Sequence, residues 1–361
     1  MKICIDISSV VYGEGVSEYT RNLVISLLKN KKKNDFSFFF SSMRRTLSFP
    51  EIDKKLVKKF RFPPTFLDIL WNKLHVFDIE KLVGKVDVFH APDWTQPPAK
   101  TAKLVTTIHD LSFLRWPESV HPKVLAAQKN RLKWVEKEAD QIIAVSEATK
   151  KEIIKLLKIP GEKITVIPES VPQDVLKFKP PGKEKIDKIK GKYKISKPFF
   201  FAYGSQAPRK NIDNLIKGFT NFNGEGKYQL VIAGRWKKEK VSDKNILATG
   251  FLARFDMLSL FSASEGFLYP SLYEGFGLPI LEGFALKVPV LTSIISSMPE
   301  VAGKAAILVD PKSVSDICLG IKNLTDKKAE LVKSGKERLK LFSWEKTARE
   351  TIKVYEKAYK S

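Results

Sequence analysis

The sequence predicts two α/β domains, each built on a parallel β-sheet that is covered by helices. Apolar strand-like runs alternate with helix-like runs along the whole chain, which is typical of that architecture. The 361 residues also amount to about twice the length of a typical domain. Residues 179–197, rich in lysine, proline and glycine, interrupt the alternation. We therefore expect one domain over residues 1–178, a second over residues 198–342, and a last helix within residues 343–361.

The first half should form a sheet of short buried strands. Apolar runs bounded by polar residues are typical of strands covered on both faces. We expect these strands at residues 2–8, 36–42, 86–92, 103–110, 141–146 and 163–168, with a helix over residues 17–28 after the first. Ser146 is placed to cap the next helix, because its hydroxyl can accept a hydrogen bond from a free amide at the helix start.

The second half repeats this pattern after the interruption. Strands are expected at residues 198–204, 228–234, 245–251, 266–271, 288–293 and 305–310. Helices should begin at Asn211, Arg254 and Leu278, and further helices close the chain, the last over residues 343–359.

Composition and charge narrow the class of protein. No apolar run reaches the ~18 residues that a membrane-spanning helix needs, and the first strand is too short for a signal-peptide core. The two cysteines, Cys4 and Cys318, lie in different halves, which favours a reducing cytoplasm over a disulfide framework. The formal charge of +23 would attract any polyanion, but lysines scattered over solvated faces explain it as well. No aromatic and basic RNA-binding motif accompanies the charge, so we expect no nucleic-acid partner.

One basic segment is amphipathic. Residues 54–62 read KKLVKKFRF, and apolar residues follow at helical spacing, namely Leu67, Leu70, Trp71, Leu74 and Phe77. Two interpretations stay open: a helix at an anionic membrane surface, or a helix that docks on its own domain with its lysines in water.

A glycine-rich turn in the second half predicts a phosphate site. Residues 269–282, YPSLYEGFGLPILE, leave a strand, turn through Gly275 and Gly277, and enter a helix with Pro279 near its first position. The free amides of Gly277 and Leu278 would then face an anion, with the positive end of the helix dipole behind them.

Two glutamates flank this turn and should have different roles. Glu274, in the loop, could accept hydrogen bonds from sugar hydroxyls, and Glu282, inside the helix, could hold a ribose diol. Without the neighbouring glycines and proline, both would be interpreted as ordinary surface charges.

A second cluster, GSQAPRKN at residues 204–211, also follows a strand and opens a helix. Arg209 and Lys210 would bring positive charge to a diphosphate whose charge grows as it leaves. Taken alone, this pair would be a solvated helix start.

His109 stands at the end of a predicted strand in the first half, followed by Asp110. It could bind a sugar or transfer a proton, or it could be a structural histidine bonded to a backbone carbonyl. The sequence lacks the motifs of other kinds of active site. The loop after the first strand misses the third glycine of a dinucleotide-binding fingerprint, and no Walker phosphate-binding loop is present. No Asp-x-Asp pair or His/Cys cluster that could bind a metal ion is present either. We therefore expect neither a metal nor a cofactor.

These motifs together resemble the family 4 retaining glycosyltransferases of the GT-B fold. The similarity rests on the Glu274 to Glu282 segment, Pro208-Arg-Lys-Asn211, Thr107-Ile-His-Asp110 and Ser297-Met-Pro-Glu-Val-Ala-Gly303, which occur in the family's order and span nearly the whole chain. The resemblance implies two Rossmann-like domains with a cleft between them, an amino-terminal acceptor domain, a carboxyl-terminal nucleotide-sugar domain, and a last helix that returns to the first domain.

The resemblance also implies roles for individual residues. Arg209 and Lys210 would bind the diphosphate, Glu282 the ribose, Glu274 the donor sugar, and His109 the sugar near the reacting centre. The catalytic candidates are thus His109, Glu274, Arg209 and Lys210. The donor-binding candidates are Gly15, Ser205, Arg209, Lys210, Gly250, Phe251, Glu274, Gly275, Phe276, Gly277, Leu278 and Glu282.

The chain departs from the family pattern at five positions. Ser17 and Glu18 replace a glycine and a basic residue in the loop after the first strand, so the acceptor chemistry of that loop is open. Glu169 and Ser170 follow Pro168 where the family commonly has asparagine and glycine. Lys287 stands where a glycine usually ends a helix, which predicts a left-handed backbone there.

We therefore expect a cytoplasmic enzyme, peripheral at the inner membrane surface, that transfers a hexose to a glycan or lipid-linked acceptor without a metal. The resemblance favours mannose from GDP-mannose, with UDP-sugars as the alternative. The rival hypotheses are a nucleotide-sugar epimerase or phosphorylase of the same fold, and a non-catalytic polyanion-binding protein.

Overall fold

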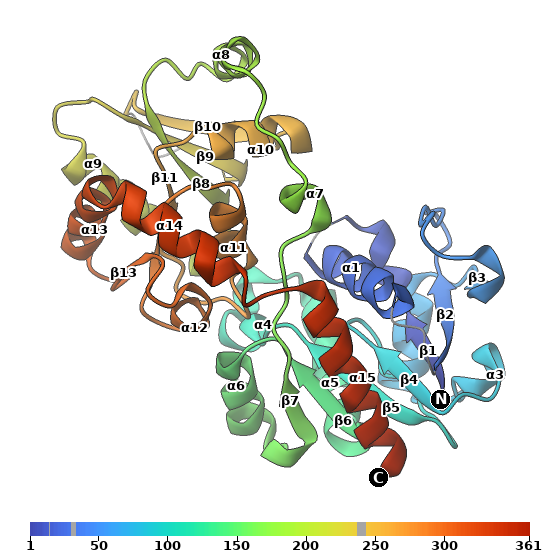
Figure 1. Ribbon diagram of the computed structural model, residues 1–361. Helices are drawn as coiled ribbons and strands as arrows, with labels where there is room; N and C mark the ends of the chain where they lie inside the picture. The colour runs from blue at the N-terminus through green and yellow to red at the C-terminus, as the bar shows by residue number, and fades with distance from the viewer. Residues whose placement is uncertain (14, 30–33, 237–242) are drawn as a thin grey trace. The chain divides into compact units, whose positions relative to one another are not determined.

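The computed structural model describes residues 1–13, 15–29, 34–236 and 243–361. Within these ranges the chain forms two compact units (Figure 1), one of residues 1–172 and 343–361 and the other of residues 173–342. Each unit contains one sheet of parallel strands surrounded by helices. The predicted α/β architecture of two parallel-sheet domains is therefore confirmed.

The first unit is built on a sheet in which, among the described residues, seven strands lie in the order β3-β2-β1-β4-β5-β6-β7. The strands are β1 Lys2–Asp6, β2 Asp35–Ser41, β3 Val57–Phe60, β4 Val88–Ala91, β5 Lys103–Ile108, β6 Gln141–Ala144 and β7 Ile164–Val166. The helices are α1 Gly15–Lys29, α2 Pro64–Leu67, α3 Glu80–Val83, α4 Ser112–Arg115, α5 Pro122–Glu138, α6 Glu147–Leu157 and α15 Trp344–Lys360. Ser146 caps α6 as predicted, accepting from the Thr149 amide.

Helix α15 belongs to the first unit although it ends the chain (Figure 1, red). Its Trp344 and Tyr355 are buried in the same core as α1 and the central strands. The Trp344 indole donates to the Val171 carbonyl at 2.9 Å, and the Tyr355 hydroxyl lies 2.7 Å from Nδ1 of the buried His90. Since an unpaired buried polar group is costly, these bonds fix where the helix sits on the sheet.

The second unit has a sheet whose six described strands lie in the order β10-β9-β8-β11-β12-β13. The strands are β8 Phe199–Ser205, β9 Gln229–Arg235, β10 Ile246–Gly250, β11 Gly266–Tyr269, β12 Val290–Ser293 and β13 Ile307–Val309. The helices are α7 Gln173–Leu176, α8 Lys183–Lys192, α9 Ile212–Phe222, α10 Arg254–Ser262, α11 Leu278–Ala285, α12 Met298–Ala302, α13 Val314–Asp326 and α14 Lys328–Leu339. Strands β9, β8 and β11 pair in parallel, so the strand ends that carry the predicted motifs share one edge of the sheet.

Two segments differ from their sequence-based expectation. The division between the units falls at residues 172 and 173, and the lysine-rich segment 179–197 lies inside the second unit, where it contains α8. The basic segment 54–62 forms a short turn and the edge strand β3, because pairing with β2 satisfies its backbone and leaves Lys58 and Lys59 in solvent. Lys287 has the expected left-handed backbone, with φ of 61°.

Candidate active site

The glycine turn before α11 has the geometry of an anion site. Gly277 adopts φ of 98°, and a Cβ there would lie 3.2 Å from Cδ1 of Ile280, so the turn requires glycine. Pro279 occupies the first turn of the helix, as predicted. Among the described residues, the amides of Gly277 and Leu278 donate to no acceptor. Two donors at a positive helix end are therefore available to a ligand.

Glu274 lies beside this turn between two cations. Its carboxylate accepts from Nη1 of Arg209 at 2.7 Å and from Nζ of Lys210 at 2.8 Å. Burial alone would raise the pKa of Glu274, but Lys210 and Arg209 hold that pKa at about 2. The carboxylate is thus ionised at every physiological pH, and it fixes both cations in place.

Local hydrogen bonds hold the Arg209 and Lys210 loop against the glycine turn. The Leu272 amide donates to the Arg209 carbonyl at 2.7 Å. Asn211 adopts φ of 57°, which asparagine tolerates better than most residues, and its buried amide donates to the Pro270 carbonyl at 2.9 Å. The Ser297 hydroxyl donates to the Glu274 carbonyl at 2.9 Å. The sequence motifs that are far apart in the chain therefore form one cluster.

Glu282 lies on α11 in a second polar environment. The Tyr203 hydroxyl donates to its carboxylate at 3.2 Å, and Arg254 approaches it at 3.5 Å while pairing with Asp174 at 2.7 Å. Burial raises the pKa of Glu282, although Arg254 and Tyr203 partly offset this. Glu282 is a buried carboxylate with only weak cationic support, and a ligand hydroxyl would be a favourable further partner.

The sequence analysis did not identify three residues that contact Glu282 or Lys210. Tyr203 lies near the end of β8, Tyr269 is the last residue of β11, and Arg254 begins α10. The Tyr269 hydroxyl accepts from Lys210 at 2.8 Å. Since ligand sites in parallel sheets gather at strand ends, the position of both tyrosines was a usable signal. The sequence contains no signal for Arg254, because its partner Asp174 is 80 residues away along the chain.

In the first unit, His109 is paired with Glu169, one of the departures from the family pattern. Nδ1 of His109 lies 3.0 Å from the Glu169 carboxylate, and the Tyr19 ring packs edge-on at 4.6 Å. Burial disfavours a charged ring, but Glu169 outweighs it and the pKa of His109 is raised. Nε2 of His109 is buried and has no partner in the described part of the chain. The interpretation as a histidine bonded to a backbone carbonyl is therefore wrong, since its partner is a carboxylate.

The remaining candidates occupy turns and strand ends. Ser205 ends β8 and accepts from the Ala207 amide at 3.2 Å, and Gly250 ends β10 with φ of 68°. Phe251 is 66% exposed, whereas Phe276 is buried against Phe342. Gly15 begins α1, and Gly275 lies between Glu274 and Phe276 in the turn.

The departure at Ser17 has a structural explanation. Its buried hydroxyl donates to the Ser9 carbonyl and accepts from the Gly13 amide at 2.8 Å, so it closes the loop after β1.

Across residues 1–13, 15–29, 34–236 and 243–361, no cluster of three metal-ligating acids, histidines or cysteines occurs. In the same ranges no helix is long and apolar enough to cross a membrane.

Comparison with known proteins identifies both halves of the chain. Residues 13–175 match the family described as Glycosyltransferase Family 4, and residues 183–340 match Glycosyl transferases group 1. The chain is 31% identical over 291 residues to the O-antigen chain mannosyltransferase B of Escherichia coli, covering 74% of each protein. It is 30% identical over 280 residues to the serotype-specific mannosyltransferase WbdA of Escherichia coli, covering 72% of this chain and 34% of that protein.

Solved structures agree on the fold. A glycosyltransferase from Rickettsia africae superposes with a TM-score of 0.71 at 20% identity, over 100% of this chain and 99% of that one. WaaG, a glycosyltransferase involved in lipopolysaccharide biosynthesis, superposes with a TM-score of 0.70 at 12% identity, over 98% and 99% of the two chains. The chain therefore belongs to the family 4, group 1 glycosyltransferases and is a hexosyltransferase with the GT-B fold.

Proposed function

We propose that the chain transfers mannose from GDP-mannose to a hydroxyl of a glycan or lipid-linked acceptor, with retention of configuration and without a metal ion. Its relatives at 30% and 31% identity carry the name mannosyltransferase, which favours mannose as the transferred sugar. One solved neighbour, from Anabaena, holds UDP and glucose, but at 15% identity it shares the fold alone. The same names favour a transferase over an epimerase, a phosphorylase or a passive polyanion-binding protein.

The observation that carries this proposal is the cluster of Arg209, Lys210 and Glu274 beside the free amides of Gly277 and Leu278. In the transfer, the bond from the anomeric carbon to the diphosphate oxygen breaks and leaves its electron pair on that oxygen. The acceptor oxygen bonds to the anomeric carbon on the same face, and its proton passes to the leaving phosphate. Charge grows on the diphosphate, so fixed cations and amides stabilise the transition state more than the bound donor.

Glu274 has two proposed tasks in this cluster. It orients Arg209 and Lys210, which both donate to it, and it has lone pairs left to accept from a hydroxyl of the donor sugar. Its low pKa, set by those cations against the effect of burial, keeps it an acceptor during the reaction. The cations have the charge that magnesium supplies elsewhere, which is the basis for proposing a metal-independent reaction.

Glu282 is proposed to accept from both ribose hydroxyls. Glu282 is 6% exposed, and its carboxylate accepts from Tyr203 and Arg254. Charge-assisted hydrogen bonds from a vicinal diol would compensate the burial that raises its pKa.

The test is turnover with a panel of nucleotide sugars. We expect GDP-mannose to raise the melting temperature most, because a ligand that binds only the folded state stabilises it. Transfer should continue in EDTA, and NMR of the product should show the anomeric configuration of the donor. Loss of activity in EDTA, an inverted product, or turnover of UDP-sugars alone would each contradict the corresponding part of the proposal.

We further propose a cytoplasmic location at an anionic membrane surface. The segment that follows β3 exposes five apolar side chains, each at least 41% exposed, namely Phe66, Ile69, Leu74, Val76 and Phe77. Four exposed lysines precede them at positions 54, 55, 58 and 59. Apolar side chains next to clustered lysines are the combination that anionic lipid attracts.

A further inference from the structure

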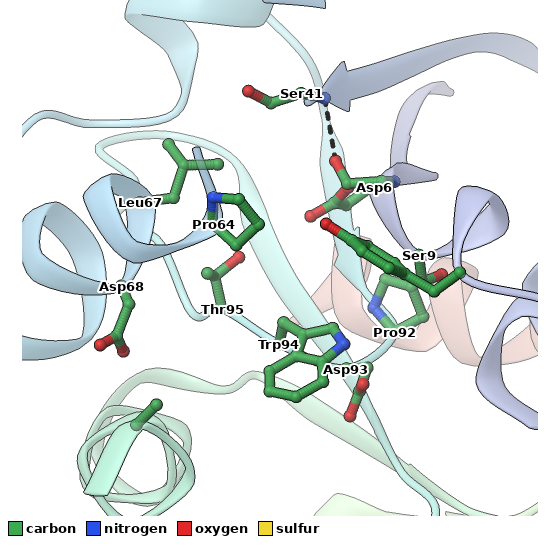
Figure 2. A pocket seen from close by; sticks show the side chains of 13 residues that line it. Asp6, Ser9, Ser41, Pro64, Leu67, Asp68, Pro92, Asp93, Trp94 and Thr95 are labelled. Carbon is green, nitrogen blue, oxygen red and sulfur yellow. Dashed lines mark hydrogen bonds between the residues drawn. The ribbon is translucent and has the colours of Figure 1, made fainter. Parts of the chain in front are cut away.

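A pocket of the first unit lies at the ends of β1, β2 and β4, and none of the motifs above accounts for it. Asp6 ends β1, Ser41 ends β2, and Pro92 follows β4. Figure 2 shows Asp6, Asp93, Trp94 and Thr95 arranged around the hollow. The space between the lining atoms is about 570 Å³, part of it open to solvent.

Polar groups with unused hydrogen-bonding capacity line the pocket. The Thr95 side chain is only 6% exposed, yet no hydrogen bond joins its hydroxyl to the described residues. The Asp93 carboxylate likewise has no hydrogen bond or ion pair in that part of the chain. Asp93 is half-buried and Thr95 is buried, so both groups keep hydrogen-bonding capacity that a ligand in the hollow could use.

Aromatic and apolar surfaces complete the lining. Trp94 is 43% exposed and Tyr12 is 41% exposed, so both present ring surface at the pocket. Pro64 and Leu67 add apolar contacts. A ligand that combines a face of C–H groups with hydroxyls at its edge would use both kinds of lining, and a sugar ring has this character.

Among the residues that the structure describes, the charged side chains that line the pocket are all acidic, namely Asp6, Asp68 and Asp93. The charge of the pocket lining is therefore opposite in sign to that of the whole chain, whose formal charge is +23. Carboxylates accept hydrogen bonds from hydroxyls but repel phosphate. Burial raises the pKa of Asp6 to about 6 and the charge of Asp93 adds to this, so a further anion would be unfavourable.

We propose that this pocket binds an uncharged sugar residue at the end of the acceptor, with hydroxyls donating to Asp93 and Asp6 and the ring against Trp94. The acceptor is therefore a glycan end, and a lipid phosphate is excluded from the pocket. This inference rests on the proposed function, because it names the acceptor class of that transferase.

The experiment measures carbohydrate binding and transfer separately. Saturation-transfer NMR with neutral disaccharides, including mannobiose, is recorded in excess GDP so that the donor site is occupied. Transfer from GDP-mannose is then compared for the same disaccharides and for a polyprenyl phosphate. We expect disaccharide binding and transfer, and no transfer to the polyprenyl phosphate.

The variants Asp93→Asn and Trp94→Ala should raise the acceptor KM about 10- to 100-fold, the usual effect of losing one charge-assisted hydrogen bond or a stacked ring. GDP binding should not change. Glu118→Gln and Tyr359→Ala are matched controls, because both residues are exposed and neither lines the pocket. Equal melting temperatures would show that the variants fold.

Three results would overturn the inference: no saturation transfer to any disaccharide, transfer to polyprenyl phosphate in place of the disaccharides, or an unchanged acceptor KM in both variants. If GDP-mannose is not turned over at all, the proposed function fails, and the NMR comparison of wild type with the two variants still decides the pocket.

Discussion

The two units present opposite charge at equivalent places. In each, polar residues gather where parallel strands end. In the first unit the charged lining of the pocket is acidic, with Asp6 and Asp93. In the second unit, Arg209 and Lys210 both contact the Glu274 carboxylate, which lies beside the glycine turn before α11. The comparison shows that the shared architecture supplies the location of a site, and the loop side chains select its ligand.

The pKa values of two buried carboxylates illustrate this difference in local charge. Asp6 is 9% exposed and Glu274 is 8% exposed, so burial favours the neutral form of both. The pKa of Asp6 is raised to about 6 by that burial, whereas Lys210 and Arg209 overcome it and hold the pKa of Glu274 at about 2. Cations in contact, rather than depth in the protein, separate the two groups.

The largest expected effect comes from removing a cation of the second unit. Arg209→Ala should lower kcat by ~10²–10³, with a smaller change in donor affinity, because the charge on the diphosphate grows as its bond breaks. Lys217→Ala removes an exposed cation of the same loop-helix region and is the control. Turnover of Arg209→Ala at the wild-type rate would show that the cluster does not stabilise the leaving group.

Stability against pH should separate the two carboxylates. The folded-state pKa of Asp6, about 6, lies above the ordinary value of 3.8, so ionised Asp6 destabilises the fold above pH 6. Asp6→Asn should raise the melting temperature at pH 8, and this gain should vanish as the pH falls from 6 towards 3.8. The folded-state pKa of Glu274, about 2, lies below the ordinary value of 4.5, so the stabilisation that ionised Glu274 contributes is present above pH 4.5 and lost towards pH 2.

Glu274→Gln should therefore lower the melting temperature at pH 8, and the deficit should shrink in acid. A displacement of about two pKa units corresponds to roughly 3 kcal/mol for each group. Thermal unfolding of both variants between pH 3 and pH 8 is the measurement. If Asp6→Asn and Glu274→Gln changed the melting temperature in the same direction at pH 8, the proposed difference in the electrostatics of the two carboxylates would be refuted.

A smaller effect is expected at the other end of the donor. Glu282→Gln should weaken GDP binding about 10- to 100-fold and leave the fold intact, because the amide accepts less strongly from ribose hydroxyls. Calorimetric titration with GDP and with the guanine base alone would show whether the lost affinity belongs to the ribose diphosphate or to the base. Equal affinity of wild type and variant for GDP would remove the ribose role.

The smallest effect concerns the basic surface of the first unit. Changing Lys54, Lys55, Lys58 and Lys59 to glutamine should reduce flotation with anionic vesicles about tenfold at low salt, and less as salt screens the charge. The matched control changes four exposed lysines elsewhere, namely Lys183, Lys217, Lys322 and Lys336. Equal flotation of the two quadruple variants would attribute binding to net charge alone.

Much of the molecule was predictable from local pattern. The alternation of apolar runs predicts the strands β1, β2 and β4 to β13, because a strand buried on both faces must be continuously apolar. The glycine and proline spacing predicts the turn before α11, since few other residues adopt φ of 98° as at Gly277. Segment 54–62 was different: its lysine pattern is compatible with a helix, and only pairing with β2 made it a strand.

The sequence by itself determined the two α/β domains and the residue types in the cluster of Arg209, Lys210 and Glu274, because backbone preferences and burial periodicity act over a few residues. Only the tertiary structure decided the partners. Glu169 meets His109 from 60 residues away, and Arg254 meets Asp174 from 80 residues away. Only folding brings Asp6 and Asp93 to one pocket without a cation among its lining residues. Charge interactions depend on distance in space and on local desolvation, neither of which a linear pattern encodes.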